Sequence, residues 1–238
     1  MSEPSDFNYD SIPVGYYDQA FHRRAGVQSK WHHLKFDRVR AEIAGRRAHL
    51  DIGCGAGTFI GTLDGEAEVV GVDLAEAQIA FARSRYQTER HRFEVVAPGP
   101  LPFADSRFDL VTIIELVEHL DPDAAAALLR EAHRVLAPGG RLVVSTPNYR
   151  SLWPLLEAMV NRLGEVSYAE QHVNRFNRRR LADLLRRTGF RDVTVEGFML
   201  AASFTAPLGW DLADRVAAVE PHALVDRFGF LLLGVGEK

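Results

Sequence analysis

The chain has 238 residues and a formal net charge of −4, with 28 basic against 32 acidic side chains. This length suits one α/β domain with added segments and a sizeable core. The densest basic run, Arg175 to Arg180, is expected to begin a solvated helix, with an anion site as the alternative, so no nucleic-acid partner is expected. No apolar run is long enough to span a bilayer and no targeting signal opens the chain, which predicts no membrane insertion and a cytoplasmic setting.

The first 40 residues form an N-terminal segment that is rich in aromatic and histidine side chains. Such side chains combine an apolar body with a polar tip. Because they do not follow one clean helical stripe, we expect a helical lid over a cofactor and a substrate. The alternative is a helix packed on the face of a sheet. The residues concerned are Tyr9, Tyr16, Tyr17, Phe21, His22, Trp31, His32 and His33.

From residue 41 to residue 238, apolar runs alternate with helical patterns, which is typical of a doubly wound α/β sheet. Strands are expected over residues 49–52, 68–72, 92–96, 108–114, 140–146, 192–198 and 228–235. Helices are expected over residues 57–63, 75–86, 122–135, 151–163 and 178–188. The last two strands are expected to pair antiparallel at one edge of the sheet. Helical insertions are expected near residues 150–175 and 200–225.

The most informative stretch predicts a strand, a glycine loop and a second strand that ends in an acid. It reads Asp51-x-Gly53-x-Gly55-x-Gly57, and Asp73 ends the next strand. Glycine lets the backbone approach a ligand where a side chain would clash. An acid about 20 residues further on can accept hydrogen bonds from both hydroxyls of a ribose. The pattern therefore predicts a nucleoside-binding crevice.

Asp51 decides between two nucleoside cofactors. A dinucleotide site prefers G-x-G-x-x-G, and a carboxylate gains little beside a diphosphate. The ammonium group of a methionine moiety gains a charge partner there, so we favour S-adenosylmethionine (SAM) over NAD. A plain strand-to-helix turn would leave Asp51 and Asp73 unexplained. Cys54 is the only cysteine, which excludes an internal disulfide, and it is expected to be a small spacer in the loop and not a nucleophile.

Several motifs together make the chain resemble the class I SAM-dependent methyltransferases over residues 31–190. They are the glycine loop, Val72-Asp73, Leu101-Pro102-Phe103 ahead of Phe108-Asp109, residues 115–120, and Arg134-Val135-Leu136-Ala137-Pro138-Gly139-Gly140. The resemblance implies a Rossmann-like, doubly wound, seven-stranded sheet with the last strand antiparallel. Ile114 would cover the methionine end of SAM. The candidate cofactor residues are Asp51, Gly53, Gly55, Gly57, Asp73, Leu74 and Ile114.

This chain departs from the family pattern at one position. Many relatives place an acid a few residues before Leu-Pro-Phe, where it binds the adenine amino group, and Ala97 stands at that place here. We therefore expect backbone groups or another side chain to bind the adenine.

A second group of polar residues follows the fourth expected strand, where the substrate face of this fold begins. In a helical turn, Glu115, Glu118 and His119 fall on one face because they occupy positions i, i+3 and i+4. Two carboxylates and an imidazole suit Mg²⁺ or Mn²⁺ and are acceptable to Fe²⁺ or Zn²⁺. His172, in Gln171-His172-Val173, is the candidate fourth ligand. The alternative is a cluster that caps a helix and lines a pocket without metal.

The E-x-x-E-H pattern resembles two groups, the ubiquinone-pathway O-methyltransferases and the small-RNA 2′-O-methyltransferases. The resemblance implies a cation on Glu115, Glu118, His119 and His172 that binds adjacent oxygens of a catechol or ribose diol. Such a cation lowers the pKa of a hydroxyl and fixes its direction. Glu115, His119 and His172 are the catalytic candidates, and a histidine that is not a ligand would take the proton. Lys35 is expected to pair with the SAM carboxylate, with a surface lysine as the alternative.

The sequence thus predicts a methyltransferase that acts on a small-molecule substrate, with a hydroxyl oxygen next to a second oxygen as the favoured acceptor. The helix with Trp153 and Met159, together with residues 201–223, is expected to form the apolar side of the substrate pocket, with core packing as the alternative. The rival functions are a metal-independent O- or N-methyltransferase with a general base, an RNA 2′-O-methyltransferase, and a catalytically silent SAM-binding partner protein. No sequence feature sets the oligomeric state.

Overall fold

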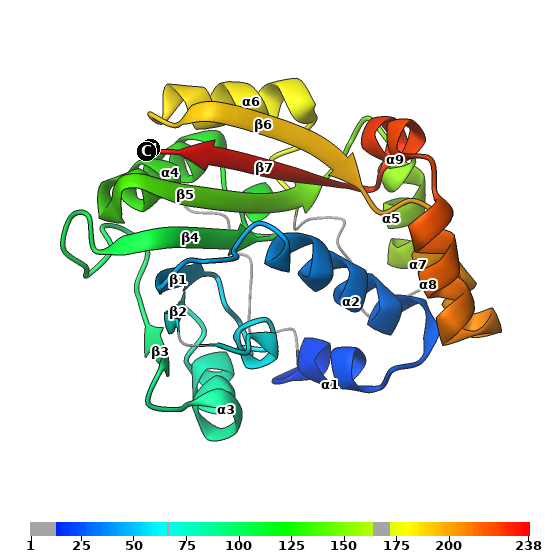
Figure 1. Ribbon diagram of the computed structural model, residues 1–238, viewed down its shortest axis with the longest axis horizontal. Helices are drawn as coiled ribbons and strands as arrows, with labels where there is room; N and C mark the ends of the chain where they lie inside the picture. Colours follow the sequence, from blue (N-terminus) through cyan, green and yellow to red (C-terminus); the bar gives the residue numbers. More distant parts are fainter. Residues whose placement is uncertain (1–12, 66, 164–171) are drawn as a thin grey trace.

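The computed structural model describes residues 13–65, 67–163 and 172–238. For residues 159–163 it describes the backbone, and of their side chains only that of Arg162. Seven strands form one sheet in the order β3-β2-β1-β4-β5-β7-β6 (Figure 1). β1 to β5 pair in parallel, whereas β7 is antiparallel to both β5 and β6. The predicted seven-stranded sheet with an antiparallel last strand is confirmed. The strands are β1 Ala48–Ile52, β2 Glu68–Asp73, β3 His91–Val95, β4 Phe108–Ile114, β5 Leu136–Pro147, β6 Arg191–Phe198 and β7 Leu231–Glu237.

Helices cover both faces of the sheet. Because side chains alternate along a strand, Leu110 and Val143 pack on one face with Phe36 of α2. Their neighbours on the other face pack against α4 and α6, around Leu129 and Leu181. The helices are α1 Tyr16–His22, α2 Gly26–Arg40, α3 Glu76–Tyr86, α4 Pro122–Val135, α5 Trp153–Leu163, α6 Arg178–Arg187, α7 Ala202–Thr205, α8 Trp210–Val219 and α9 His222–Phe228, with 3₁₀ turns η2 Ile60–Thr62, η3 Val117–His119 and η4 Ala206–Leu208.

The helix predicted for residues 57–63 is wrong. The chain forms only the 3₁₀ turn η2 there. Gly57 has a φ of +75°, a left-handed conformation that interrupts a right-handed helix. Gly61 packs so closely on the ring of Tyr86 that a Cβ would lie 2.3 Å from the ring. The glycine loop is thus longer than expected and is held by α3.

The N-terminal segment consists of two helices with different surroundings. In α2, Phe36 and Val39 belong to the core on one sheet face, so the packed-helix alternative describes α2. α1 lies against the glycine loop, where Thr58 Oγ1 donates to the buried Asp18 carboxylate at 3.0 Å. Arg85 Nε of α3 lies 3.0 Å from the same carboxylate. The lid role stays a prediction for α1, and Tyr9 lies outside the described residues.

The two helical insertions lie beside each other at one end of the molecule. Figure 1 shows α5, α7, α8 and α9 at the edge where β5 and β6 end. In sheets of this kind, ligands bind outside the carboxyl ends of the parallel strands. The insertions therefore border the face on which a substrate is expected.

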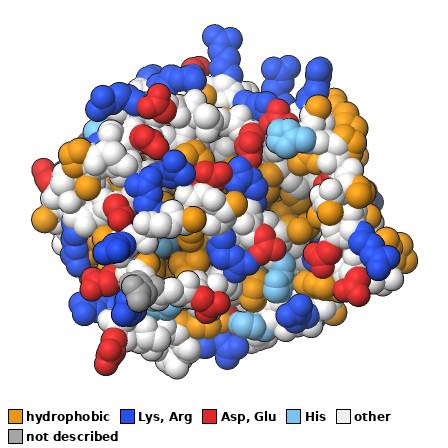
Figure 2. Space-filling view, viewed as in Figure 1, with side chains coloured by type: hydrophobic (Ala, Val, Ile, Leu, Met, Phe, Trp, Pro, Cys, Tyr) orange, Lys and Arg blue, Asp and Glu red, His pale blue; other side chains and the backbone are white. Residues whose placement is uncertain are grey.

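The arginine-rich run lies at the start of α6. Asn177 caps the helix by accepting a hydrogen bond from the Arg180 backbone N–H at 3.1 Å, and Arg178 pairs with Asp226 of α9. Figure 2 shows basic side chains gathered along the upper edge, over α6, and mixed with acidic ones elsewhere. The expected solvent-facing helix start is what the structure contains. Among the described residues, no helix combines the length and apolar character that crossing a bilayer requires.

Candidate active site

The glycine loop folds back on the end of β2. The backbone N–H groups of Gly53 and Cys54 donate to Val72 O at 2.8 and 3.1 Å. Asp73 then receives two main-chain hydrogen bonds, from Gly55 N to Oδ2 at 2.8 Å and from Ala75 N to Oδ1 at 2.9 Å. A carboxylate oxygen has two lone pairs, so each oxygen of Asp73 can still accept a ligand hydroxyl. The loop therefore fixes the orientation of this carboxylate at the end of β2 and leaves each oxygen able to accept a further hydrogen bond.

The three glycines of the loop do different work. A Cβ on Gly53 would lie 2.9 Å from Leu116, and one on Gly57 would lie 2.7 Å from Phe93, so both are needed for packing. Gly55, with φ +50°, has no atom within 4 Å of the place where its Cβ would point. The expectation that glycine leaves room for a ligand therefore fits Gly55 best.

Four further residues bear on the expected cofactor site. Leu74, beside Asp73, is 43% exposed although it is apolar, whereas Ile114 is half-buried at the end of β4. Burial raises the pKa of the Cys54 thiol well above its usual value, so this cysteine is not an activated nucleophile. Ala97 is exposed and carries no polar group for adenine.

Asp51 lies beneath the loop and is buried. Its Oδ1 accepts a hydrogen bond from Thr112 Oγ1 at 2.5 Å, and His49 Nε2 lies 2.7 Å from the same hydroxyl. Burial raises the pKa of Asp51 to about 7, the Asp73 charge adds to the rise, and the Thr112 hydrogen bond opposes it. Neither Thr112 nor His49 was predicted as a site residue from the sequence. The signal was available, because both are polar residues in otherwise apolar strands next to Asp51.

Lys35 and Glu115 were expected in two different roles, and the structure joins them in an ion pair. Lys35 is buried in α2, and its Nζ bonds Glu115 Oε2 at the end of β4. Glu115 has a φ of +51°, which is uncommon for a residue with a side chain. Its backbone N–H is fixed by Ser145 O at 3.0 Å. A strained residue held in this way marks the strand end as a constrained part of the site.

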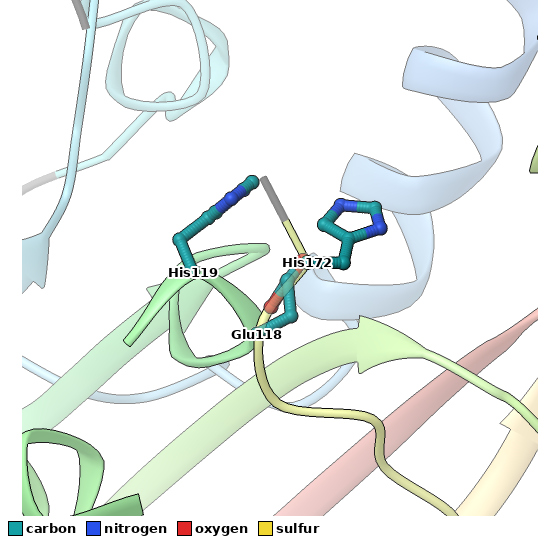
Figure 3. A group of neighbouring side chains, drawn as sticks. All are labelled: Glu118, His119 and His172. Atoms are coloured by element: carbon teal, nitrogen blue, oxygen red, sulfur yellow. The ribbon is translucent and has the colours of Figure 1, made fainter. Parts of the chain in front are cut away.

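The predicted convergence of side chains is found for three residues of the proposed four. Glu118, His119 and His172 each offer a ligand atom, and these atoms lie within 4.8 Å of one another. Figure 3 shows Glu118 and His119 on the segment that contains η3, with His172 approaching from a separate segment. Glu115 is not in this group, because η3 begins at Val117 and the strained backbone at Glu115 takes its side chain toward Lys35. Gln171 lies outside the described residues.

Glu118 is the most unusual member of this group. The residue is 1% exposed, and its Oε2 accepts a hydrogen bond from Thr146 Oγ1 at 3.0 Å. Its Oε1 is buried with no hydrogen-bond partner among the described residues. Burial raises the pKa of Glu118 to about 8, and the nearby Glu115 charge contributes to the rise. A buried carboxylate oxygen without a partner is costly, and a bound cation would remove that cost.

His172 is held by two residues that the sequence analysis missed. Its Nδ1 lies 2.5 Å from Glu157 Oε1 and 3.0 Å from Tyr149 Oη, and Tyr149 donates to the same carboxylate. Burial lowers the pKa of His172, while the Glu157 charge opposes that effect. Because a carboxylate only accepts, the Nδ1 position carries the proton in this arrangement. Metal-binding histidines are commonly oriented by such a carboxylate.

An aromatic cluster lies next to His172. Trp153 of α5 has its ring 6.1 Å from that of His172 and 5.7 Å from that of Trp31 in α2. Phe204 of α7 and Phe230 pack against Trp31 at 6.5 and 5.9 Å. The two insertions and α2 therefore supply an apolar wall beside the Glu118, His119 and His172 group.

The comparisons with known proteins define the class. The model of a methyltransferase domain family matches residues 23–195, so the chain belongs to that family. A probable SAM-dependent methyltransferase of Mycolicibacterium smegmatis is 33% identical over 160 residues, which cover 67% of this chain and 57% of the relative. A ubiquinone biosynthesis O-methyltransferase of Pseudomonas aeruginosa is 37% identical over 115 residues, which cover 46% of this chain and 47% of that protein. The chain spans about half the length of the curated relatives it matches.

Solved structures agree on the fold. A SAM-dependent methyltransferase from Archaeoglobus fulgidus superposes with a TM-score of 0.63 at 24% identity, covering 94% of this chain and 100% of the other. A methyltransferase from Thermotoga maritima, described as a possible histamine N-methyltransferase, gives a TM-score of 0.63 at 22% identity, covering 93% and 94%. The sheet order, the glycine loop and the family match together make this chain a class I SAM-dependent methyltransferase.

Proposed function

We propose that this methyltransferase transfers the methyl group of SAM to a hydroxyl oxygen of a small molecule that carries a second oxygen next to it. We propose further that Glu118, His119 and His172 hold a divalent cation. The observation that carries the proposal is the buried, unpartnered Oε1 of Glu118 beside two imidazoles. The ubiquinone O-methyltransferase of Pseudomonas aeruginosa, similar over 115 residues, supports oxygen as the acceptor atom.

The cofactor would lie across the tips of β1, β2 and β4. Asp73 would accept the ribose hydroxyls, because its carboxylate stands at the strand tip. Gly55 would give room to the ligand, and the exposed Leu74 would cover part of the adenosine. Asp51 would face the ammonium group and Ile114 the methionine end. Gly53 and Gly57 would contribute by holding the loop in shape.

The donor set fits a divalent cation. A carboxylate oxygen and two imidazole nitrogens suit Mn²⁺, Fe²⁺ and Zn²⁺, and Mg²⁺ is accepted when the substrate adds oxygens. When bound, such an ion lowers the pKa of a hydroxyl and fixes its direction. Glu157 holds the His172 ring in one orientation, and the aromatic wall at Trp153 excludes water from that side. Lys35 keeps Glu115 beside this group.

A metal-independent reaction is the second candidate, and a specific observation favours it. The paired Glu157 and His172 have the geometry of an oriented general base, and burial lowers the pKa of His172 so that it is neutral at pH 7. Glu115, expected as a ligand, is engaged by Lys35. In this mechanism His172 would take the proton of the acceptor directly.

Chelation separates the two mechanisms. The protein is stripped with EDTA, and turnover of SAM is measured with a panel of catechols and of matched phenols that lack the second hydroxyl. The metal mechanism predicts lost turnover, recovery with Mn²⁺ and selectivity for the catechols. It also predicts that Mn²⁺ binding, measured by calorimetry, disappears in Glu118→Gln but persists in Glu76→Gln, an exposed control. Turnover that survives stripping, with catechols and phenols used alike, would reject the metal and favour the general base.

A further inference from the structure

Asp51 is held by a short chain of buried polar groups that ends at His49. Thr112 Oγ1 of β4 donates to Asp51 Oδ1 at 2.5 Å. A hydroxyl that donates its one proton to Asp51 must accept from His49, so His49 Nε2 at 2.7 Å carries a proton. The three residues lie on the adjacent strands β1 and β4, with Asp51 opposite Thr112 in the register. The direction of the hydrogen bonds is therefore fixed from His49 to Thr112 to Asp51.

We infer that Thr112 and His49 are positioning residues for the cofactor: they hold Oδ1 of Asp51 so that Oδ2 faces the ammonium group of SAM. The inference rests on the proposed contact between Asp51 and that ammonium. It explains why polar side chains at positions 49 and 112 are buried in otherwise apolar strands. Hydrogen-bonded polar groups are tolerated in a core when each has its partner, as these three do.

The hydrogen bond from Thr112 also affects the ionisation of Asp51. The titratable groups that face Asp51 are Asp73 from β2, Cys54 from the loop and His49. Burial raises the pKa of Cys54 and lowers that of His49 to about 3, so both stay neutral near pH 7. Burial and Asp73 raise the pKa of Asp51 to about 7, and the Thr112 hydrogen bond opposes them. Loss of that hydrogen bond therefore makes Asp51 harder to ionise.

The test measures how tightly S-adenosylhomocysteine binds between pH 5.5 and 8.5, by calorimetry. Ionised Asp51 is needed to pair with the ammonium, so affinity falls as pH drops through the Asp51 pKa. Thr112→Val keeps the side-chain shape, and we expect about tenfold weaker binding at pH 7 and a midpoint shifted to higher pH. Thr112→Ser restores both values. His49→Phe gives a smaller change in the same direction, because Thr112 can still donate to Asp51.

The control is Thr188→Val at the C-terminal cap of α6, another buried threonine whose hydroxyl bonds only main-chain carbonyls among the described residues. It is expected to leave affinity and midpoint unchanged, and circular dichroism checks that each variant is folded. A folded Thr112→Val with the wild-type affinity and midpoint would overturn the inference, and so would a uniform loss of affinity without a shifted midpoint. Asp51→Asn tests the proposed contact between Asp51 and the ammonium group separately. If this variant also binds normally, Asp51 does not contact the cofactor, and both that contact and the inference about Thr112 and His49 are rejected.

Discussion

The proposed cofactor end and the proposed acceptor end of this site are built in different ways. At the cofactor end, main-chain N–H groups donate hydrogen bonds to Asp73, and the loop itself is hydrogen-bonded to Val72 near the end of β2. At the acceptor end, His172 is held by Glu157 and Tyr149, two side chains from another segment. Main-chain geometry changes little when side chains are exchanged, so the cofactor end is a property of the fold. The proposed acceptor end depends on individual side chains, so we expect few substitutions to alter its specificity.

The largest effect is expected at the cofactor end. In Asp73→Ala, the ribose loses its acceptor, and the N–H groups of Gly55 and Ala75 lose theirs. Hydrogen bonds to a charged group contribute about 1.5–3 kcal/mol each, so we expect the Kd for S-adenosylhomocysteine to rise about 100-fold or more. Calorimetry measures this Kd, with the exposed Asp123→Ala as the control. A Kd within about threefold of wild type would remove Asp73 from the cofactor site.

The geometry of the proposed cofactor end could be predicted from the sequence because it depends on local order. A strand, a glycine loop and an acid at the next strand end are consecutive in the chain, and parallel pairing of β1 and β2 brings them together. The separate roles of the three glycines could not be predicted. Gly53 and Gly57 must lack a side chain because Leu116 and Phe93 pack against them, and these residues are far along the chain, so only the folded structure shows the contacts.

The acceptor end could be predicted only in part, for a physical reason. Glu118 and His119 are adjacent, and His172 was found through a family pattern. Glu157 was missed because its contact with His172 depends on how α5 is placed. The position of Glu115 was wrongly expected, since helical spacing does not apply where the backbone takes a positive φ. Side-chain direction at a strained residue cannot be derived from spacing.

The next prediction concerns stability and tests the burial of Glu118. Its pKa in the folded chain is about 8 against an ordinary value of 4.5, so between these values the folded state binds more protons than the unfolded state. The contribution of this group to stability must then fall as pH rises from about 5 to 8, by at most about 1.4 kcal/mol per pH unit. Glu118→Gln removes that contribution, so the stability of the variant relative to wild type rises over this pH range.

Denaturant unfolding in the presence of EDTA, at a series of pH values, measures this effect. Asp51 contributes with the same sign because its pKa is also raised, and His49 contributes with the opposite sign below about pH 6.5 because its pKa is lowered, so the effect of Glu118→Gln is read as the difference from wild type at each pH. Glu76→Gln, at an exposed position, is expected to keep the wild-type slope. An unchanged slope in Glu118→Gln would show that water reaches this carboxyl in the folded protein.

Glu157→Gln tests how far the acceptor end depends on one orienting side chain. The amide keeps the shape of the carboxylate but weakens the hydrogen bond to His172 Nδ1. Loss of a carboxylate that orients a ligating histidine typically costs about 10- to 100-fold in metal affinity or activity. We expect about a tenfold loss of kcat with unchanged S-adenosylhomocysteine affinity. A loss of cofactor affinity instead would show that the two ends are coupled and not separately built.

The smallest effect is expected for Leu74→Ala, which tests the apolar part of the cofactor end. Leu74 is 43% exposed, so its truncation should leave the free energy of unfolding nearly unchanged. If adenosine covers it, the lost apolar contact amounts to about 0.6 kcal/mol, or about a threefold rise in the Kd for S-adenosylhomocysteine. Leu208→Ala, at an 81% exposed position in the second insertion, provides the matched control. Equal affinities in the two variants would place the adenosine away from Leu74. The main-chain cradle at Asp73 would then account for cofactor binding without help from side-chain packing at this position.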